Sequence, residues 1–507
     1  LVADTGALAA LRGIQPDCPD WTGRGRVVAL STSTRHTEFR LDDLVLGRDE
    51  ARAAGRVVTI VDEDRGFGVR DLDMVLRNVE LEVLRPYLDT LPFAGELTGR
   101  LRADGYRSLL SLSGDLVFLD ALPPGDPQSS FAFNGDVEFG GDAGATFRAF
   151  TLRQALVDLA TVRELVPAVV LPGRLRLVGR LDGPWQNARF VGTADHLAPN
   201  DALSRMLGTV RMDTRGEILG LEMDVRFDRL SFDALRTGYP TLTPRGGLTG
   251  TLVASGPLDA LRIDADVTGD LGSVRATGGF GVLDDGGYRA DSLVLDVRRL
   301  DAEALLGRGQ ATALNGRITA TGTVDTLGPP QGEVLLDLGQ SRIGGFTIDG
   351  VQGRLASSPS TIRIDSVLAT WSTGRVLADG TLCWAAPESG SLAIDAAGFS
   401  LTNFDPLARA TLPLEPDTLN PQPLDGLARA QMRLHGSLDQ LALDGVVEAE
   451  DLVLDGWKVA VLEARCNARP VLQQGIETDE AHRTIGEADA GAVRACMAAV
   501  AGREGRP

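Results

Sequence analysis

The side chains best suited to catalysis or metal binding are few and lie far apart in this sequence. The chain has four histidines, His36, His196, His435 and His482. It has four cysteines, Cys18, Cys383, Cys466 and Cys496. No two histidines have the spacing of metal ligands, and the cysteines form no Cys-x-x-Cys pair. We therefore expect neither a zinc site nor a disulfide framework.

Motifs that activate a nucleophile or bind a phosphate group are also missing. The sequence contains neither a Gly-x-Ser-x-Gly elbow nor a glycine-rich loop ending in Gly-Lys. The glycine-rich segment Gly278–Gly281 lies among strand-like runs and indicates a bulge or a turn. Carboxylates are numerous, but they alternate with apolar residues as on the solvent-facing side of a strand. We expect no enzyme activity, no catalytic residue, no metal and no cofactor.

Alternation of apolar and polar residues runs through most of the chain. In residues 221–228, Leu221, Met223, Val225 and Phe227 alternate with charged side chains. A period of two is typical of β-strands with one buried face. The sequence therefore predicts many short strands that share an apolar face and a polar face.

A pattern of apolar, small, aliphatic, aliphatic and glycine at every second residue recurs along the chain. Its clearest copy lies in Leu248–Val267, which we interpret as two strands joined at Gly256-Pro257. The copies begin at Leu97, Leu171, Leu248, Leu314 and, more weakly, Ala428. Such a long period of short strands predicts a repeat protein. The interval before the last copy is long enough to contain a degenerate one.

Short helices are expected where each repeat begins. Helical spacing of apolar residues predicts a helix within residues 72–88 and an amphipathic helix over 152–166. Residues 230–235 and 300–305 occupy the same place in later repeats, as do residues 401–407 less regularly. Because the strands that follow lack long crossovers, we expect antiparallel meanders.

The repeats divide the chain into three parts. Residues 1–70 predict a truncated first β unit, and residues 71–465 hold the repeated units. The Gly-spaced strand pairs fall near residues 97–118, 171–194, 248–267, 314–338 and 428–447. The Pro-rich segment 412–424 is the best linker candidate. Residues 466–507 leave the repeat and form a tail that we expect to be helical or disordered.

Composition narrows the class of protein. Hydrophobic residues make up 43% of the chain but aromatic residues only 5%, which suits one face of many strands better than several compact cores. The net charge of -20 and the scattered basic residues argue against nucleic-acid binding. No apolar run reaches the roughly 18 residues of a transmembrane helix. Because the sequence begins with Leu, we interpret it as a fragment.

The apolar face must be buried, and the pattern alone leaves three ways open. The sheet could pack on a second sheet, close into a solenoid core, or curl into an open gutter that holds an apolar ligand. Glycine at alternate positions permits the curvature of a gutter. It equally suits the tight turns of a packed solenoid, and packed cores are the commoner outcome.

Five short segments carry a resemblance to a known family. They are residues 230–235 (LSFDAL), 247–252 (GLTGTL), 255–259 (SGPLD), 424–426 (LDG) and 435–445 (HGSLDQLALDG). They resemble the AsmA-like/TamB family, the bacterial relatives of bridge-like lipid-transfer proteins. The resemblance covers about residues 70–465. It implies an all-β repeat protein, namely an elongated, curved antiparallel β-sheet with a taco-like groove and short interspersed helices.

The resemblance also implies a function and a location. Members of that family are anchored in the inner membrane by an N-terminal helix and bridge the periplasm. They are implicated in phospholipid movement to the outer membrane and in outer-membrane protein assembly. The implied partners are phospholipid, both membranes and an outer-membrane barrel assembly protein. We expect this chain to be a periplasmic fragment without the anchor and without the C-terminal region that meets the outer membrane.

Ten aliphatic residues are our candidates for the lining of a lipid groove. They are Leu97, Leu101, Leu175, Leu177, Leu252, Ile263, Ile318, Val334, Met432 and Leu434. The alternative is that they line a dry core. Two other functions stay open at this point: an assembly factor that templates outer-membrane proteins through its strand edges, and a packed β-solenoid that serves as a structural protein or adhesin.

Overall fold

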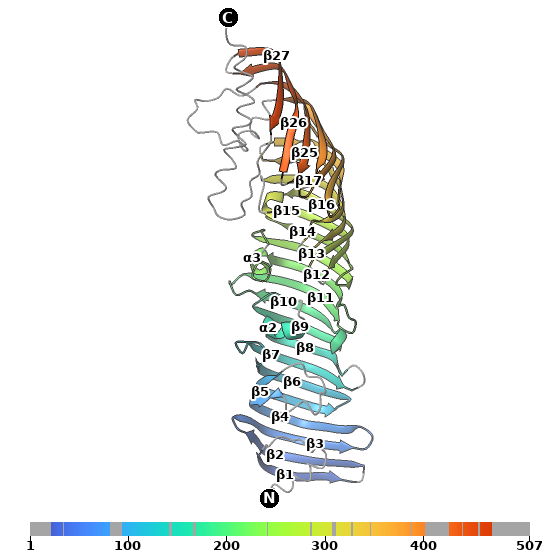
Figure 1. Ribbon diagram of the computed structural model, residues 1–507. Helices are drawn as coiled ribbons and strands as arrows, with labels where there is room; N and C mark the ends of the chain where they lie inside the picture. Colours follow the sequence, from blue (N-terminus) through green and yellow to red (C-terminus); the bar gives the residue numbers. More distant parts are fainter. Residues whose placement is uncertain are drawn as a thin grey trace. The chain divides into compact units, whose positions relative to one another are not determined.

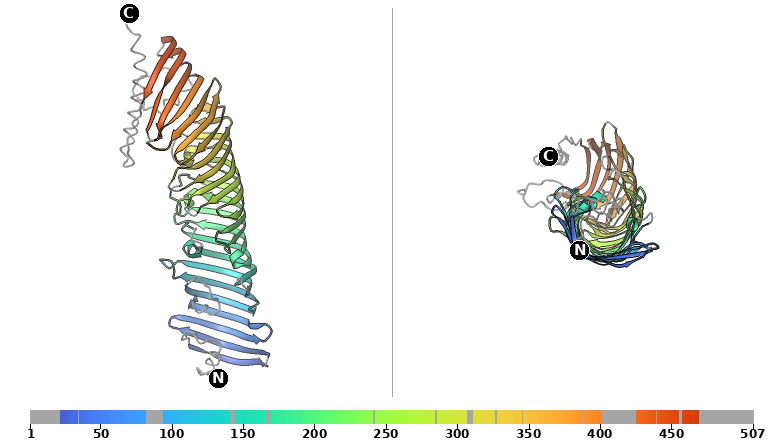
Figure 2. Two further views of the ribbon diagram at one scale, coloured as in Figure 1. Left: turned by 45° about the vertical axis from the view of Figure 1, so that its right-hand side comes forward. Right: turned by 90° about the horizontal axis from the view of Figure 1, so that it is seen from below.

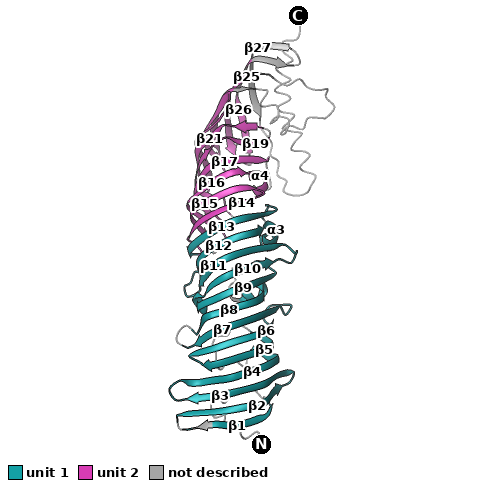
Figure 3. Cartoon of the chain, turned by 180° about the vertical axis from the view of Figure 1, so that it is seen from behind, with its two compact units in different colours: residues 1–257 teal, residues 258–507 magenta. Residues whose placement is uncertain are grey.

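The computed structural model describes most of the chain between residues 22 and 468. The described ranges are 22–33, 35–81, 94–140, 144–165, 169–240, 242–283, 286–306, 311–325, 328–344, 346–386, 388–400, 425–438, 440–454 and 457–468. The chain divides into two compact units, unit 1 with residues 1–257 and unit 2 with residues 258–507 (Figure 3). The described residues of both units lie mostly in strands.

Unit 1 is a meander in which every strand pairs antiparallel with the next strand along the chain (Figure 1). Its strands are β1 (Thr22–Thr32), β2 (His36–Arg48), β3 (Ala51–Asp62), β4 (Gly66–Glu80), β5 (Gly95–Tyr106), β6 (Leu109–Asp120), β7 (Gln128–Phe139), β8 (Ala145–Asp158), β9 (Arg174–Pro184), β10 (Arg189–Leu197), β11 (Leu203–Asp213), β12 (Gly220–Ser231) and β13 (Gly247–Pro257). Among the described strands of unit 1, β1 pairs with β2 alone, so the sheet is open. Figure 2 shows its strands, blue to green, side by side and bent.

Unit 2 has the same plan with one insertion. Its strands are β14 (Leu261–Gly269), β15 (Gly272–Val282), β16 (Tyr288–Leu300), β17 (Thr312–Val324), β18 (Gln331–Leu338), β19 (Ser341–Ile343), β20 (Phe346–Ile348), β21 (Gly350–Ser357), β22 (Thr361–Trp371), β23 (Gly374–Cys383), β24 (Gly390–Ser400), β25 (Asp425–Ser437), β26 (Gln440–Leu454) and β27 (Trp457–Ala468). The main sheet passes from β18 to β21. The hairpin β19–β20 leaves that sheet and pairs with the first residues of β17.

A bulged strand followed by a glycine-bearing strand marks each repeat junction. Register shifts occur in β4 before β5, β8 before β9 and β12 before β13 of unit 1. In unit 2 they occur in β16 before β17, β22 before β23 and β24 before β25. The junction at β23 lies in the long interval where the sequence could hide a degenerate repeat, and Gly380 supplies its glycine.

Short helices occupy the connections at three junctions. They are α2 (Leu159–Leu165) after β8, α3 (Phe232–Leu235) after β12 and α4 (Ala302–Leu306) after β16. A 3-10 turn, η3 (Trp185–Asn187), connects β9 to β10. The short helices expected at residues 230–235 and 300–305 are confirmed, whereas residues 401–407 lie outside the described ranges.

Of the other two helix predictions, the one within residues 72–88 is wrong over its described part, and the one over 152–166 is confirmed only at its end; residues 82–88 lie outside the described residues. Residues 72–80 belong to β4, and residues 152–158 belong to β8, so that only α2 remains of the expected amphipathic helix. Each of these strands has two bulges. Because a bulge inserts one extra residue, apolar side chains on one face become three apart and imitate the spacing of a helix.

The repeat glycines allow neighbouring strands to approach closely. Gly99 in β5 has φ 139°, and a Cβ atom there would lie 2.1 Å from the carbonyl oxygen of Asp115. Gly316 in β17 has φ 136°, and its Cβ would lie 2.4 Å from the oxygen of Asp337. No larger residue fits at these positions unless the strands move apart.

Polar side chains satisfy the backbone at the bulges. The N–H of Ala149 in β8, which has φ 50°, donates to Oδ1 of Asp182 in β9 at 2.9 Å. The N–H of Ser292 in β16 donates in the same way to Thr321 Oγ1 in β17 at 3.2 Å. A bulged residue loses its ladder partner. The acceptor therefore comes from a side chain of the next strand, which fixes the bulge in place.

The expected fold class is confirmed: the chain is mainly β, with an open, curved antiparallel sheet in each unit and few short helices. An open antiparallel meander is not the packed β-solenoid considered as an alternative. Residue 70, the expected end of the first β unit, lies within β4. β27 continues the sheet to Ala468. The linker candidate 412–424 and the tail beyond residue 468 lie outside the described residues.

Candidate functional site

The apolar side chains of unit 1 form two unbroken cross-strand ladders on one face of the sheet, which we call the apolar face. The first ladder is Leu44, Gly55, Met74, Leu101, Gly114, Phe133, Leu152, Gly179, Gly192, Gly208, Val225 and Leu252. The second is Leu46, Ala53, Leu76, Gly99, Leu116, Phe131, Ala155, Leu177, Ala194, Met206, Phe227 and Gly250. Every rung from β2 to β13 is apolar or glycine.

Unit 2 has two ladders of the same kind on its own apolar face. The first is Ala265, Ala276, Leu295, Ile318, Leu336, Gly353, Val367, Ala378, Ile394, Met432 and Gly445. The second is Ile263, Gly278, Leu293, Ala320, Val334, Leu355, Ile364, Gly380, Leu392, Leu434 and Leu443. The rungs at Gly353 and Gly278 cross bulges, where a Cβ would lie 2.6 and 2.9 Å from the Cα atoms of Val367 and Leu293.

The structure places all ten predicted groove residues on these apolar faces, and all ten are half-buried. Eight of them stand in the four ladders: Leu101, Leu177, Leu252, Ile263, Ile318, Val334, Met432 and Leu434. The other two, Leu97 and Leu175, lie in the adjoining rows opposite Phe118 and His196. Residues as far apart in sequence as Ile263 and Leu434 thus share one ladder.

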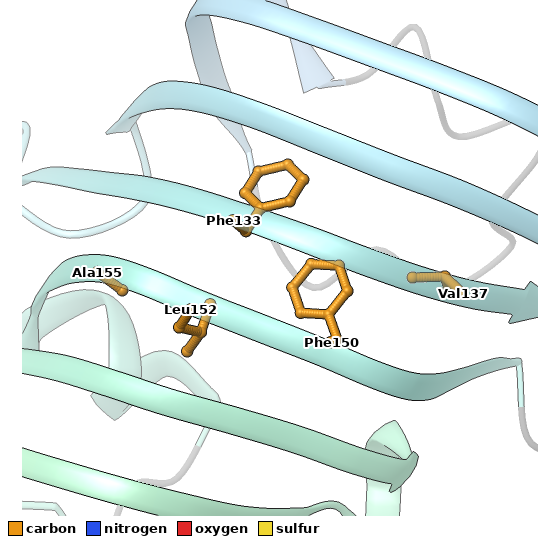
Figure 4. Packing of buried hydrophobic residues seen from close by; sticks show 5 residues of the cluster. All are labelled: Phe133, Val137, Phe150, Leu152 and Ala155. Carbon is orange, nitrogen blue, oxygen red and sulfur yellow. The ribbon is translucent and has the colours of Figure 1, made fainter.

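The larger of two described clusters of buried apolar side chains in unit 1 lies between β7 and β8 (Figure 4). Its buried residues are Phe133, Val137, Phe150, Leu152 and Ala155. The rings of Phe133 and Phe150 stack with their centroids 5.3 Å apart. The Phe133 ring also covers Gly114, since a Cβ at Gly114 would lie 2.9 Å from its Cζ atom. A ring laid over glycine fills the space that the missing side chain leaves.

A polar margin borders the apolar face of unit 1 at the strand ends. The hydroxyls of Ser129 and Ser204 accept backbone N–H groups at 3.0 Å from Asp158 and Ser231. His196 Nε2 lies 2.9 Å from the carbonyl oxygen of Pro172. These polar groups are buried and hydrogen-bonded, so they hold the repeat connections and need no ligand.

The opposite face of each sheet, the polar face, carries many charged side chains, whose sign alternates from strand to strand in some rows. In unit 2 one row reads Asp266, Arg275, Asp296, Arg317 and Asp337. Arg317 Nε donates to Asp296 Oδ1 at 2.8 Å and lowers the pKa of that carboxyl. The Arg100 guanidinium likewise lowers the pKa of Asp73 in unit 1. Such pairing is typical of a solvated face.

The described histidines of the polar face are partners in ion pairs. His36 lies 2.8 Å from Asp62 through Nδ1 and 3.0 Å from Glu38 through Nε2. Hydrogen bonds to Asp62 and then Glu38 raise the pKa of His36. His435 pairs with Asp444. Within the described ranges, no group of three or more His, Cys, Asp or Glu side chains has an arrangement that could hold a metal ion.

Sequence reasoning missed the aromatic residues of the apolar face. Phe131, Phe133 and Phe150 lie at or next to the best-packed site, yet none belongs to the repeated glycine pattern. They could have been identified from the sequence, because Phe131 and Phe133 lie two residues apart in a strand-like run and therefore on the same face. In the part of the chain that the structure describes, no helix is long and apolar enough to cross a membrane.

Comparison with known proteins assigns no family to the chain. No protein-family model matches it, and no curated protein matches it significantly. Its function must therefore be argued from the geometry of the two faces.

Proposed function

We propose that the apolar faces bind the acyl chains of phospholipids and that the chain is a non-enzymatic part of a lipid carrier. The observation that supports this proposal is the pair of unbroken apolar ladders in each unit. Most of their long side chains are half-buried in an open sheet, so an apolar ligand can reach them, whereas a minority are buried, namely Met74, Phe133, Leu152, Val225 and Leu392. A closed core would instead bury these side chains fully.

The energetics favour a ligand that slides along such a face. Exposing an acyl chain to water costs about 0.8 kcal/mol for each CH₂ group. An apolar surface without a polar rung removes that cost at every position, so successive positions differ little in free energy. The polar groups at the strand ends allow the lipid head group to stay in water while the acyl chain lies on the apolar face.

The setting we propose is the one that the resemblance to the AsmA-like/TamB family implies. In that setting the protein works in the periplasm, is held at the inner membrane and supports outer-membrane biogenesis by carrying phospholipid between the two membranes. The regular junctions of bulged strand, short helix and glycine-bearing strand are consistent with a repeat protein built for length. Purification from its own host, with identification of the bound lipids, addresses this setting directly.

The test of lipid binding is native mass spectrometry of the full chain, with extraction of bound lipid. We expect several phospholipids on the wild-type chain. Leu252→Asp places a charge in a ladder and should remove most of them. Val253→Asp is the matched control, because Val253 is the next residue in β13, lies on the polar face and is 48% exposed.

If Leu252→Asp unfolds its surroundings, Leu336→Asp and its control Leu335→Asp are a second matched pair of variants, in unit 2. Leu336 stands in a ladder, whereas Leu335 faces Thr319 and Arg354 and is 44% exposed. Circular dichroism shows whether each variant keeps its strands. A folded wild-type chain that carries no lipid, or equal lipid on Leu252→Asp and Val253→Asp, contradicts the proposal.

Strand-edge templating of outer-membrane proteins is a second candidate function. The observation that favours it is that β1 pairs on one side only among the described strands of unit 1. An open edge can accept an added strand through its backbone. Val28→Pro in β1 would then abolish capture of an unfolded barrel strand while lipid binding persists. If the variant captures an unfolded barrel strand as well as the wild type does, the edge of β1 is not the templating site.

A further inference from the structure

We propose that unit 1 contains a binding site for a phosphate group at the edge of its sheet, where the hairpin between β2 and β3 turns. A hollow of about 780 Å³ lies there, lined among others by Thr22, Arg48, Asp49, Glu50, Arg52 and Arg77. None of these residues belongs to the two apolar ladders. The inference therefore does not rest on the proposed acyl-chain binding.

Strand register places two arginines directly opposite each other at this hollow. Arg52 in β3 faces Arg77 in β4, and Arg52 faces Gly47 on its other side. Both side chains are exposed. Like charges at directly opposed positions destabilise a sheet unless something of opposite charge lies between them.

Many arginines of the polar face lack a carboxylate partner, but in the other directly opposed pairs of unit 1, Arg189–Arg211 and Arg205–Arg229, one arginine has such a partner within the described residues. Arg100 donates to Asp73, and Arg205 donates to Asp195. Arg52 and Arg77 form neither an ion pair nor a hydrogen bond with any residue of the described ranges. The two guanidinium groups at this site thus have no anionic partner among the residues that the structure describes.

The acidic residues at the hollow are arranged around Arg48 instead. Arg48 lies 3.9 Å from Asp49 and 3.6 Å from Glu80. Asp49 and Glu50 line the hairpin side of the hollow, and neither of them forms an ion pair with Arg52 or Arg77. They weaken the local positive potential but leave the two opposed guanidinium groups available.

A phosphate group is the ligand that this arrangement fits best. Each guanidinium presents a planar fork of N–H donors that matches two phosphate oxygens. One phosphate between Arg52 and Arg77 would turn their repulsion into two charge-assisted contacts. The same chemistry is offered by free phosphate, by a soluble phosphate ester and by a phospholipid head group.

The experiment measures binding of inorganic phosphate by titration calorimetry at low ionic strength, where surface charges are least screened. We expect the double variant Arg52→Gln/Arg77→Gln to bind about tenfold more weakly than the wild type. The control Arg148→Gln/Arg153→Gln removes the same charge from arginines that are paired with Glu138 and Asp115. It should bind like the wild type.

A second arm identifies the source of the phosphate. Vesicles of phosphatidylcholine containing phosphatidic acid are compared with pure phosphatidylcholine vesicles by cosedimentation. A loss on Arg52→Gln/Arg77→Gln with the anionic vesicles alone assigns a lipid head group, and a loss with inorganic phosphate alone assigns a soluble ligand. Asp49→Asn/Glu50→Gln should tighten either interaction.

One result overturns the inference. If the double arginine variant and its control bind inorganic phosphate and both kinds of vesicle equally, Arg52 and Arg77 do not form an anion site. Hydrogen exchange of β3 and β4 checks that the variants are folded. Because acyl-chain binding is measured separately by Leu252→Asp, this failure would leave the proposed function intact.

Discussion

Leu177 and Val178 are neighbours in β9 and are both aliphatic, yet they have different surroundings. Leu177 faces Ala155 and Ala194 across the strands and is half-buried. Val178 faces Thr193, lies on the polar face and is 45% exposed. The same contrast separates Leu252 from Val253 and Leu336 from Leu335. The type of a side chain therefore does not decide which surface it builds.

What decides the surface is the row of residues to which a position belongs. A ladder stays apolar over every strand of a unit, whereas a row of the polar face mixes charged, polar and aliphatic side chains, as in the row from Asp266 to Asp337 where the sign alternates. An aliphatic residue on the polar face is isolated, and isolated exposed aliphatics are ordinary on protein surfaces. Only the ladders give the continuous apolar surface that an acyl chain needs.

The largest effect should come from forcing a side chain into a ladder glycine. Gly316→Val places atoms against the oxygen of Asp337 and gives a β-branched residue a φ of 136°. Together the strain and the overpacking should destabilise β17 and β18 by about 3–5 kcal/mol. Hydrogen exchange of these strands is the measurement, because repeats can unfold in part.

Gly47→Ala is the control on the polar face. A Cβ at Gly47 would meet nothing closer than 3.6 Å, the oxygen of Ala51. The free energy of unfolding should change by no more than about 0.5 kcal/mol. Equal destabilisation by Gly316→Val and Gly47→Ala would show that glycine does not distinguish the two faces.

Much of this comparison could be predicted from the sequence. The period of two assigned Leu252 and Ile318 to one face without ambiguity, because alternation survives wherever the register is regular. The glycine spacing identified strands such as β5 and β17. Both inferences depend on local pattern alone, which is why they succeeded.

Bulges and register account for what the sequence did not reveal. Bulges changed the apolar spacing of β4 and β8 so that it imitated helices. The acceptors that mark bulged residues such as Asp71 and Ala149 are Asp104 and Asp182, which lie on the next strand. The opposition of Arg52 and Arg77 depends on how β3 and β4 align. That alignment is long-range information, and no motif within either strand contains it.

Removing a bulge acceptor should have the next largest effect. Asp182→Ala leaves the N–H of Ala149 without a partner and frees Arg180, which should lower the stability of the β8–β9 junction by about 1–2 kcal/mol. Asp182→Asn keeps an acceptor and should restore most of the loss. Denaturant unfolding combined with hydrogen exchange of Ala149 measures both variants.

Asp115→Ala is the control for that prediction. Asp115 is 72% exposed and pairs with Arg153 at 3.2 Å, so its loss should cost about 0.5 kcal/mol or less. If Asp182→Ala is no more destabilising than Asp115→Ala, then the side chains beside the bulges do not fix the curvature of the sheet.

The smallest effect should be a local response of the polar face to acid. Arg215 and its backbone N–H lower the pKa of Asp213 to about 2, against about 3.9 in an unfolded chain. The folded chain therefore holds this proton less tightly, and the stabilisation from the pair is complete above about pH 4 and is lost as the pH falls toward 2. Arg215→Gln should raise the pKa of Asp213 toward its ordinary value in a carboxyl NMR titration, while hydrogen exchange of the apolar ladders stays unchanged.

A titration of Asp213 near pH 4 in the wild type would mean that the charges of the polar face are not paired as the structure has them. Altered exchange in the ladders of Arg215→Gln would mean that the two faces are coupled and do not behave as independent surfaces.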